Sequence, residues 1–593
     1  MTASWRAITL LAATAWRADR RLTLAVAAEP LGNTLGLLAG LWLAALTTGT
    51  IEHDTTLLAL GVTGLVTGAG LGWQLDLSSS QWRMLLSEKM TYAFEIENAQ
   101  LAAVLPGLDH HERPEYQAKL ELLRQRQGQL GDAMSTLAMA YKAVSGGLVV
   151  LVLLVLAHPL LLGLVALALP AVVIARYEQR WRQAAEEAAA LPGRTARYLR
   201  TLAYDRDAGM EVRVFGLAAE LEDRAAQAWA QYRRPLERAE RRVALVTCAR
   251  DGLMVAGIVT AVGFELWQVV NGRATPGEAI LVVYVSRQVQ SAVTWPVQAV
   301  GSVGQTLRTA ARLQWLRGYA ASVAARYAGG QPAPAALAGG IEFDNVSFRY
   351  PGTDTWVLRE VSMTLPAGSV LAVVGENGAG KTTLVKLLAR MYEPTTGRIL
   401  VDGVDLAEID IASWRQRLSA AFQDFARLEF TAQHTVGAGD LARLDDEGHV
   451  LGALERAGAV DVLSALPDGA ATQLGAQWDG VDLSTGQWQK LALGRALMRT
   501  QPVMVFFDEP TAALDAPSEH ALFERYAAAS RDGTERGMIT ILVSHRFSTV
   551  SAADRVLVLA GQQVAEYGTH DELVAAGHLY AELYDLQARS YQS

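Results

Sequence analysis

Hydrophobic residues form long blocks in the first half of the chain and short runs in the second half. The long blocks lie at 22–48, 55–75, 146–175, 252–270 and 277–300. A helix needs about twenty apolar residues to cross the hydrocarbon core of a membrane. The 146–175 block is too long for one span, and its central His158 and Pro159 are a natural tight turn. The pattern therefore predicts six membrane helices, with spans three and four joined as a hairpin.

Arginines indicate how these spans are oriented. They crowd the N-terminus and the segments 76–140 and 176–245, whereas the short loops between spans hold few. By the positive-inside rule, the long segments and both chain ends lie in the cytoplasm. The long segments are rich in Ala, Leu, Glu, Arg and Gln, which predicts helices that continue from the membrane and turn around 109–116 and near 208–216. Each turn is expected to press a short helix on a partner, the alternative being solvated helices with no docking role.

Charged residues also interrupt the apolar pattern at its start and within some of the spans. Arg6, Arg17 and Arg20 divide the first twenty residues, which favours an amphipathic helix on the inner membrane face over a signal peptide. Glu29 and Arg287 carry formal charges at membrane depth, where a charge is costly and usually faces a cavity or a partner. We assign them to the translocation pathway, with a structural ion pair or snorkelling as the equal alternative.

The second half of the chain has a different pattern. A Pro, Ala and Gly-rich linker follows the last span, and from Ile341 short apolar runs alternate with helical stretches, as in an α/β domain. The expected domains are an all-α six-span membrane domain at 1–326, a linker at 327–340 and an α/β domain at 341–593, for which the motifs described next predict a P-loop ATPase.

Composition narrows the class of protein. Of the 593 residues 51% are hydrophobic and only 19% are charged, which is too apolar for an ordinary soluble protein and supports the membrane spans. The net charge of -9 argues against a nucleic-acid partner, because phosphate binding needs a concentrated basic face. The single cysteine, Cys248, permits no internal disulfide, and no Cys/His cluster has metal-ligand spacing.

A glycine-rich loop is the first candidate functional motif of the α/β domain. The stretch "VLAVVGENGAGKTTLVKLL" reads as a buried strand, a loop and a helix. Gly375, Gly378 and Gly380 let backbone N–H groups surround phosphate oxygens. Lys381 is placed to reach the β- and γ-phosphates, and the Thr382 hydroxyl to bind Mg²⁺. The loop predicts a nucleotide site.

A carboxylate pair supplies the second half of that site. In "PVMVFFDEPT" the apolar run VMVFF predicts a strand, with Asp508 at its end, where a Mg²⁺ ion needs a carboxylate. Glu509 beside it is placed to act as the base that orients and activates the attacking water.

A second candidate anion site lies between these two motifs, about a hundred residues after the glycine-rich loop. In "LSTGQ", a serine and a glycine stand at the start of an apolar helix, where backbone N–H groups point at an anion. The glycine-rich loop is already a complete phosphate site, so the residues alone do not explain why one domain has a second.

Together these motifs resemble the ATP-binding cassette (ABC) transporters, specifically exporter-type half-transporters, over essentially the whole chain. The resemblance implies roles for further residues: Tyr350 stacks on adenine, Asn377 and Thr383 contact the nucleotide, Gln423 senses Mg²⁺ and the membrane domain, Asp515 is the D-loop aspartate, His545 is the switch histidine at the γ-phosphate, and Ser484, Gly486 and Gln487 form the signature.

The chain departs from the family pattern at three places. Thr485 stands where the signature usually has glycine, which adds a Cβ and a methyl group at a close approach. Ala476 and Gln477 stand where an acidic residue is common, which puts a salt bridge from that loop to the membrane domain in doubt. Ala512 replaces a frequent serine, a mild change.

The resemblance implies an ATP-driven exporter in the bacterial cytoplasmic membrane that works by alternating access. Its cofactors are ATP and Mg²⁺, its partner is a second half-transporter, most simply itself, and its substrate is an unidentified peptide, lipid or hydrophobic small molecule. Each ATP is then held between the P-loop of one copy and the signature of the other. An importer on the same fold and an ATP-gated channel or regulatory membrane protein remain the alternatives.

Overall fold

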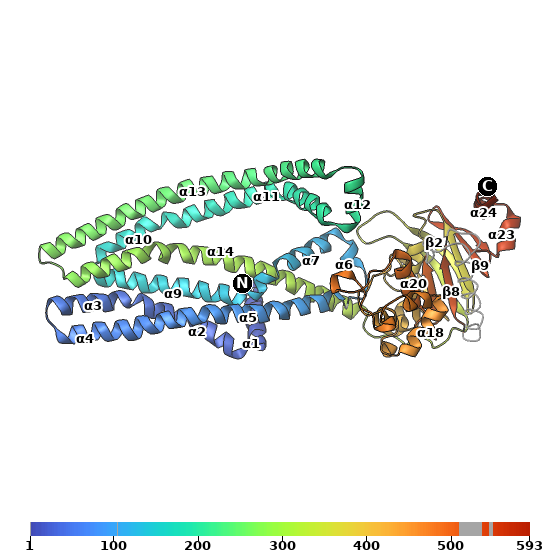
Figure 1. The fold of residues 1–593 in the computed structure, drawn as a ribbon, viewed down its shortest axis with the longest axis horizontal. Coiled ribbons are helices and arrows are strands. Elements are labelled where there is room, and N and C mark those ends of the chain that lie inside the picture. The colour runs from blue at the N-terminus through green and yellow to red at the C-terminus, as the bar shows by residue number, and fades with distance from the viewer. Residues whose placement is uncertain (1, 104, 509–536, 545–549, 593) are drawn as a thin grey trace. The chain divides into compact units, whose positions relative to one another are not determined.

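A computed structural model describes residues 2–103, 105–508, 537–544 and 550–592. The chain forms two compact units (Figure 1). The first, which we call the membrane unit, contains residues 1–102 and 120–317. The second, the cassette unit, contains residues 318–593 together with the segment 103–119.

The described part of the membrane unit is helical. Its helices are α1 (Thr2–Ala18), α2 (Arg20–Leu37), α3 (Ala39–Ile51), α4 (Thr55–Gly64), the π-turn η1 (Leu65–Ala69), α5 (Gly70–Ala103), α7 (Pro114–Arg126), α8 (Gly128–Gly131), α9 (Ala133–Ala157), the 3₁₀ turn η2 (Pro159–Leu161), α10 (Leu162–Ala168), α11 (Pro170–Tyr204), α12 (Arg206–Val214), α13 (Ala218–Val270) and α14 (Pro276–Arg326). At 1.5 Å per residue α13 is about 80 Å long, far more than a membrane core needs. The predicted extension of membrane helices beyond the membrane is therefore present.

Local chemistry sets several helix ends. The Asp54 carboxylate accepts hydrogen bonds from the amides of Thr56 and Leu57 and so caps α4. His158 ends α9, and the turn that follows starts α10, at the position that the sequence predicted for the hairpin. Pro170 lies at the first position of α11, where its missing N–H leaves no helical hydrogen bond unmade.

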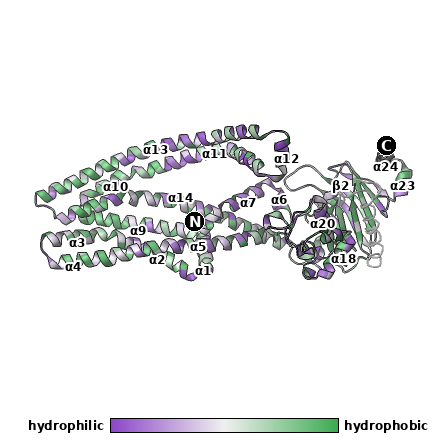
Figure 2. Cartoon of the chain, viewed as in Figure 1, coloured by the Kyte–Doolittle hydropathy of each residue, from purple (hydrophilic) through white to green (hydrophobic). Residues whose placement is uncertain are grey.

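Five helical segments of the described chain are long and apolar enough to cross a membrane. They are Arg20–Ile51, Thr55–Ala103, Ala133–Ala157, Leu162–Tyr204 and Ala218–Val270. Figure 2 shows hydrophobic residues along α3, α4 and α10 and hydrophilic ones along α7 and α12. The sixth predicted span lies within the 51-residue α14, where Arg287, Gln288 and Gln298 dilute the apolar run, so this span stays a prediction.

The first helix packs one of its faces against other helices, and its predicted place on the inner membrane face stays a prediction. Ala7, Leu11 and Ala15 of α1 are buried in a cluster with Met90 of α5 and Leu313 of α14. The apolar face of α1 thus covers neighbouring helices, because close packing against them buries it more completely than a headgroup layer would. The prediction of an amphipathic helix is right, but its apolar face packs against protein.

The cassette unit contains two sheets in the order β2-β1-β4-β5 and β10-β9-β3-β8-β7-β6. The strands are β1 (Gly340–Phe348), β2 (Leu358–Pro366), β3 (Val370–Gly375), β4 (Thr396–Val401), β5 (Val404–Asp405), β6 (Leu418–Ala421), β7 (Met504–Asp508), β8 (Ile539–Val543), β9 (Arg555–Ala560) and β10 (Gln563–Gly568). In the larger sheet β10 is antiparallel and the other five strands are parallel.

Helices and short turns cover these sheets. They are α6 (Asp109–Glu112), α15 (Lys381–Leu388), η3 (Leu406–Glu408), α16 (Ile411–Gln416), α17 (Ala432–Gly437), η4 (Leu441–Arg443), α18 (Glu447–Ala457), α19 (Val460–Ser464), η5 (Gly469–Ala471), η6 (Ala476–Trp478), α20 (Thr485–Ala496), α23 (His570–Ala576) and α24 (Leu579–Gln592).

The larger sheet separates two hydrophobic cores. Successive side chains of a strand point to opposite faces, and along β3 Ala372 belongs to one core while Leu371 and Val373 belong to the other. Helix α15 packs into the second core through Leu384, and α20 packs into the first through Leu491. The glycine-loop helix and the signature helix therefore lie on opposite faces of the same sheet.

Trp414 is an anchor of the second core. It is fully buried, and its indole N–H donates to the carbonyl oxygen of Leu388 at 2.8 Å. We expect Trp414→Ala to cost about 3–5 kcal/mol of cassette stability, because it leaves a cavity and an unpaired carbonyl. Calorimetry of the purified protein would measure this as an earlier cassette transition. Trp478→Ala, at an indole that is 61% exposed, is the control with a much smaller effect, and equal effects of the two variants would contradict the prediction.

Candidate functional site

The glycine-rich loop joins β3 to α15, and its backbone requires two of its glycines. Gly375 has φ 151°, and a Cβ there would lie 2.4 Å from the carbonyl oxygen of Leu559. Gly380 has φ 100°, and a Cβ there would lie 2.8 Å from a methyl carbon of Leu358. No other residue fits either place without moving the neighbouring strand or side chain.

Lys381 reaches back over this loop. Its side chain is largely buried, and Nζ donates to the carbonyl oxygens of Gly375 at 2.8 Å and Glu376 at 3.0 Å. The ammonium group therefore lies over the curved loop at the N-terminus of α15, where backbone N–H groups and the helix dipole also favour an anion. Asn377 is exposed on the same loop. The arrangement fits a polyphosphate.

Thr382 and Asp508, both predicted to bind Mg²⁺, contact each other beside the loop. The Thr382 hydroxyl donates to a carboxylate oxygen of Asp508 at 3.2 Å, and Asp508 is 3% exposed at the end of β7. A hydroxyl and a carboxylate are ligands that suit Mg²⁺, which usually takes its remaining ligands from water and phosphate. In the described chain no three His, Cys, Asp or Glu side chains gather into a metal site, so an ion here would rely on such outside ligands.

Gln423 lies at the same edge of the sheet. It is exposed two residues beyond the end of β6, which pairs in parallel with β7. The carboxyl ends of parallel strands form one edge, where α/β sheets bind their ligands. Gln423 and Asp508 are thus on the same side of the glycine-rich loop. Three other predicted residues, Glu509, Asp515 and His545, lie outside the described residues.

Tyr350 contacts α15, the helix that follows the glycine-rich loop. Its hydroxyl lies 3.0 Å from the hydroxyl of Thr383, and its ring meets that of Tyr392 edge-on with centroids 5.4 Å apart. Lys386 Nζ lies 5.2 Å from the centre of the Tyr350 ring. These contacts hold the ring beside the phosphate loop, a position compatible with the predicted stacking on a base.

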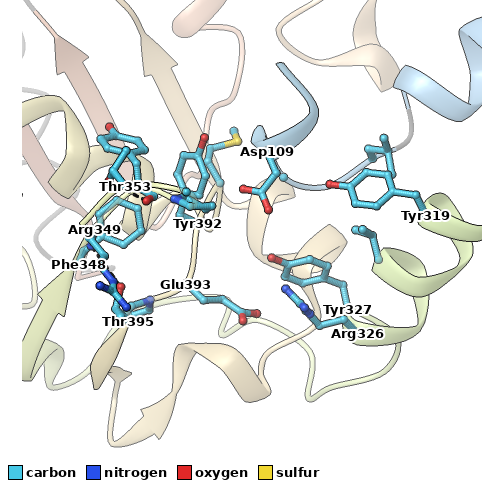
Figure 3. A pocket seen from close by; sticks show the side chains of 18 of the residues that line it. Asp109, Tyr319, Arg326, Tyr327, Phe348, Arg349, Thr353, Tyr392, Glu393 and Thr395 are labelled. Carbon is cyan, nitrogen blue, oxygen red and sulfur yellow. Dashed lines mark hydrogen bonds between the residues drawn. The ribbon is translucent and has the colours of Figure 1, made fainter. Parts of the chain in front are cut away.

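A pocket of about 560 Å³ lies beside Tyr350 within the cassette unit. Figure 3 shows Asp109, Tyr319, Tyr327 and Tyr392 around it. Burial raises the pKa of the Asp109 carboxyl. Burial, with the nearby Asp109 as a smaller cause, raises the pKa of Tyr319 to about 12. The tyrosine therefore stays neutral at physiological pH.

Glu112 holds the segment 103–119 beside this pocket, and the sequence analysis did not single this residue out. Glu112 accepts hydrogen bonds from Lys386 Nζ at 2.8 Å and from the hydroxyl of Tyr392. Burial acts to lower the pKa of Lys386, but the hydrogen bond and negative charge of Glu112 outweigh it, so the pKa lies above its ordinary value. Arg415 also donates to the carbonyl oxygen of Pro106 at 2.5 Å. Lys386 thus contacts both Glu112 and the Tyr350 ring.

We expect Glu112→Gln to loosen this segment, because a neutral amide replaces the charged partner of Lys386. Amide hydrogen exchange in residues 105–117 should become about tenfold faster, since exchange follows the local opening equilibrium. The exposed Glu115→Gln in the same segment is the matched control. Unchanged exchange in Glu112→Gln would contradict the assigned anchor.

The signature residues form the start of α20. Ser484 is its N-cap: its hydroxyl accepts from the amide of Gln487 at 3.3 Å, and its own amide donates to the Gln487 side chain at 2.9 Å. This reciprocal pair leaves the amides of Thr485 and Gly486 at the exposed end of the helix. Thr485 is itself exposed, so its extra methyl group meets solvent within this chain.

The loop that contains Ala476 and Gln477 lacks the acidic residue common in the family, but Glu429 places a carboxylate beside it. One oxygen of Glu429 accepts hydrogen bonds from the Gln477 side chain and from the Trp478 indole at 3.0 Å. Gln473 also donates to the Glu429 carbonyl oxygen at 2.8 Å. The chain segment after β6 thus brings an acid to the loop that Ala476 and Gln477 leave without one. No local sequence signal marks this pairing.

Glu29 and Arg287, the two charges that the sequence analysis assigned to membrane depth, have different environments. The Glu29 side chain is fully buried and pairs with Arg83, with Lys142 Nζ at 3.7 Å. Arg287 is exposed on α14. For Glu29 the structure favours the ion-pair alternative that the sequence left open.

Comparisons with known proteins agree with this site. Residues 358–512 match the ABC transporter family. The chain is 41% identical to an ATP-dependent lipid A-core flippase of Bordetella avium over 42% of its length and 41% of that protein. It is 36% identical to the cyclolysin secretion/processing ATP-binding protein CyaB of Bordetella pertussis over 57% of its length and 46% of that protein. The chain thus spans less than half the length of these relatives.

A solved structure extends the likeness to the whole fold. A bacterial Atm1-family ABC exporter with ATP bound superposes with a TM-score of 0.76 at 24% identity, covering 96% of this chain and 99% of that one. The resemblance predicted from the motifs and the expected fold class are both confirmed. Residues 358–512 therefore match the ABC transporter family, and the chain as a whole has the fold of that exporter structure, with a helical part and an α/β part on one polypeptide.

Proposed function

We propose that the chain is one half of an ATP-driven exporter in which two copies enclose two ATP molecules. The observation that carries this proposal is the placement of α15 and α20 on opposite faces of one sheet. Lys381 begins α15 on one face and Ser484 caps α20 on the other, so we expect a phosphate held by Lys381 to meet the signature of another copy rather than Ser484 of the same chain. A second copy, turned head to tail, would present its α20 to that phosphate and complete the site.

The chain's own residues have distinct roles in this reaction. The glycine-rich loop and Lys381 bind and orient the phosphates, and Tyr350 stacks on the base. Mg²⁺, when bound by Thr382 and Asp508 with Gln423 nearby, would neutralise charge on the phosphates. We assign to Glu509 the orientation of the attacking water, to His545 contact with the γ-phosphate, and to Asp515 a contact across the paired cassettes.

A homodimer is the simplest assembly. The chain holds both a complete glycine-rich loop and a capped signature helix, so two copies form two complete sites. Helix α12 of the membrane unit also exposes Met210 and Val214, with Phe215 following it, each by more than two thirds. An apolar surface of this kind marks a protein contact, and we assign it to the cassette of the second copy.

Location and direction rest on charge and on the relatives. The arginine-rich segments belong in the cytoplasm of a bacterium, together with the cassette. Two relatives are called a lipid A-core flippase and a secretion ATP-binding protein. These names support outward transport by alternating access, in which ATP-driven closure of the cassettes reorients the membrane helices.

Cross-linking between copies tests the assembly. Asn377 and Thr485 are both exposed, so we place one cysteine at each in a Cys248→Ser, Glu509→Gln chain. With ATP, the oxidised protein should run as a covalent dimer, because the two positions belong to opposite halves of a composite site. Without nucleotide the dimer should decrease strongly. A monomeric product at saturating ATP would refute the proposal.

A further inference from the structure

We propose that a pocket in the membrane unit, between α2, α5, α9 and α14, binds cationic amphiphiles, with Asp76 contacting the positive group and aromatic side chains the apolar body. The inference rests on the proposed function in one respect: it makes this pocket the site of the transported substrate. The binding itself follows from the residues that line the pocket.

The pocket has a volume of about 370 Å³. Asp76 and Lys142 line it, while Leu37 of α2 and Val150 of α9 provide apolar wall. Gly36 also lines it, and a Cβ added to Gly36 would meet no atom within 4 Å. One cavity therefore has charged and apolar lining, as an amphiphile requires.

A network of four charges determines which sign a ligand meets. Lys142 Nζ lies 2.5 Å from an Asp76 oxygen and 3.7 Å from a Glu29 oxygen. Glu29 also forms an ion pair with Arg83. The Lys142 side chain is only 18% exposed and Glu29 is fully buried, whereas the Asp76 side chain is 52% exposed. Two acids and two bases cancel in total, but the Asp76 carboxylate is the most exposed of the four, since the Arg83 and Lys142 side chains are only 19% and 18% exposed. A cation is therefore favoured over an anion.

Aromatic side chains favour the same ligand. Trp73, Trp295 and Tyr284 line the pocket, and the two indoles are 69% and 50% exposed. The Tyr284 hydroxyl donates to the carbonyl oxygen of Gly36 at 2.9 Å, which holds that wall in place. Aromatic faces attract cations and pack against flat apolar groups. Charge and shape thus point to one class, an organic cation with a substantial apolar part.

Tetraphenylphosphonium is a suitable probe, and tetraphenylborate has the same shape with the opposite charge. Equilibrium dialysis against the full-length protein in nanodiscs, without nucleotide and with empty nanodiscs as blank, should show saturable binding of the cation only. Asp76→Asn should weaken this binding by about tenfold, the loss of one charge contact. Asp251→Asn, an acid on α13 that does not line the pocket, should bind like the wild type.

Gly36→Leu tests the pocket independently of its charges. The added side chain should fill the cavity without a clash at its Cβ and abolish saturable binding. Wild-type affinity in both Gly36→Leu and Asp76→Asn would overturn the proposal, as would saturable binding of tetraphenylborate alone. These measurements need no ATP turnover. If the wild type binds the cation but hydrolyses no ATP, the exporter proposal fails alone; if it hydrolyses ATP but binds no cation, the pocket proposal fails alone.

Discussion

Lys381→Met is expected to lower the kcat of ATP hydrolysis by about 100- to 1000-fold, the usual loss when one group that stabilises transition-state charge is removed. The ammonium group lies over the glycine-rich loop through its contacts with Gly375 and Glu376, so it meets a polyphosphate without reorganisation. Methionine keeps the length of the side chain and removes the charge. Steady-state phosphate release by the purified protein in lipid measures the effect.

Lys490→Met is the matched control for this variant. Lys490 forms an exposed ion pair with Asp461 at 2.7 Å, and pairs of this kind contribute little to stability. Its turnover should stay close to wild type. A Lys381→Met protein that elutes as the wild type does and keeps more than about a tenth of its turnover would refute the assigned role of the ammonium group.

Ser484→Asp is expected to stop ATP hydrolysis while leaving α20 intact. Aspartate caps a helix as well as serine does, so the start of α20 keeps its hydrogen bond to Gln487. The new carboxylate would face the partner's γ-phosphate, and like charges at close range cost several kcal/mol. Ser484→Asn keeps the cap without the charge and is the control, with a much smaller loss.

Mixed dimers of two differently tagged copies show which chain each site belongs to. With Lys381→Met and Ser484→Asp on the same copy and a wild-type partner, both composite sites are damaged, and turnover should fall to background. With one change on each copy, one site carries both lesions and the other is intact. Turnover should then be about half that of wild type if the sites act independently. The reverse pattern would mean that each chain completes its own site.

Local sequence predicted those parts of the site that neighbouring residues build. The strand, the glycine-rich loop and Lys381 occupy one short stretch, and backbone conformation there follows from glycine at Gly375 and Gly380. Asp508 was predicted for the same reason, because an apolar strand places its last residue at the ligand-binding edge of a parallel sheet. Thr382 and Asp508 therefore contact each other.

Contacts between distant segments were not predictable. Nothing near Glu112 indicates that its carboxylate pairs with Lys386, and nothing near Gln477 indicates that Glu429 supplies the missing acid. The expectation for Glu29 was left open for the same reason, since its partner Arg83 belongs to another helix. Such pairs depend on how helices and loops pack, which single-residue patterns do not encode.

The sequence by itself determined the fold class, the nucleotide loop and the start of the signature helix, because periodicity, glycine conformation and helix capping act over a few residues. Only the tertiary structure decided that α15 and α20 lie on opposite faces of one sheet, and that Asp76 is the most exposed charge of the membrane pocket. Both results depend on which side chains become buried when distant segments pack. Burial excludes water, and it therefore decides which charges and helix ends stay available to another molecule.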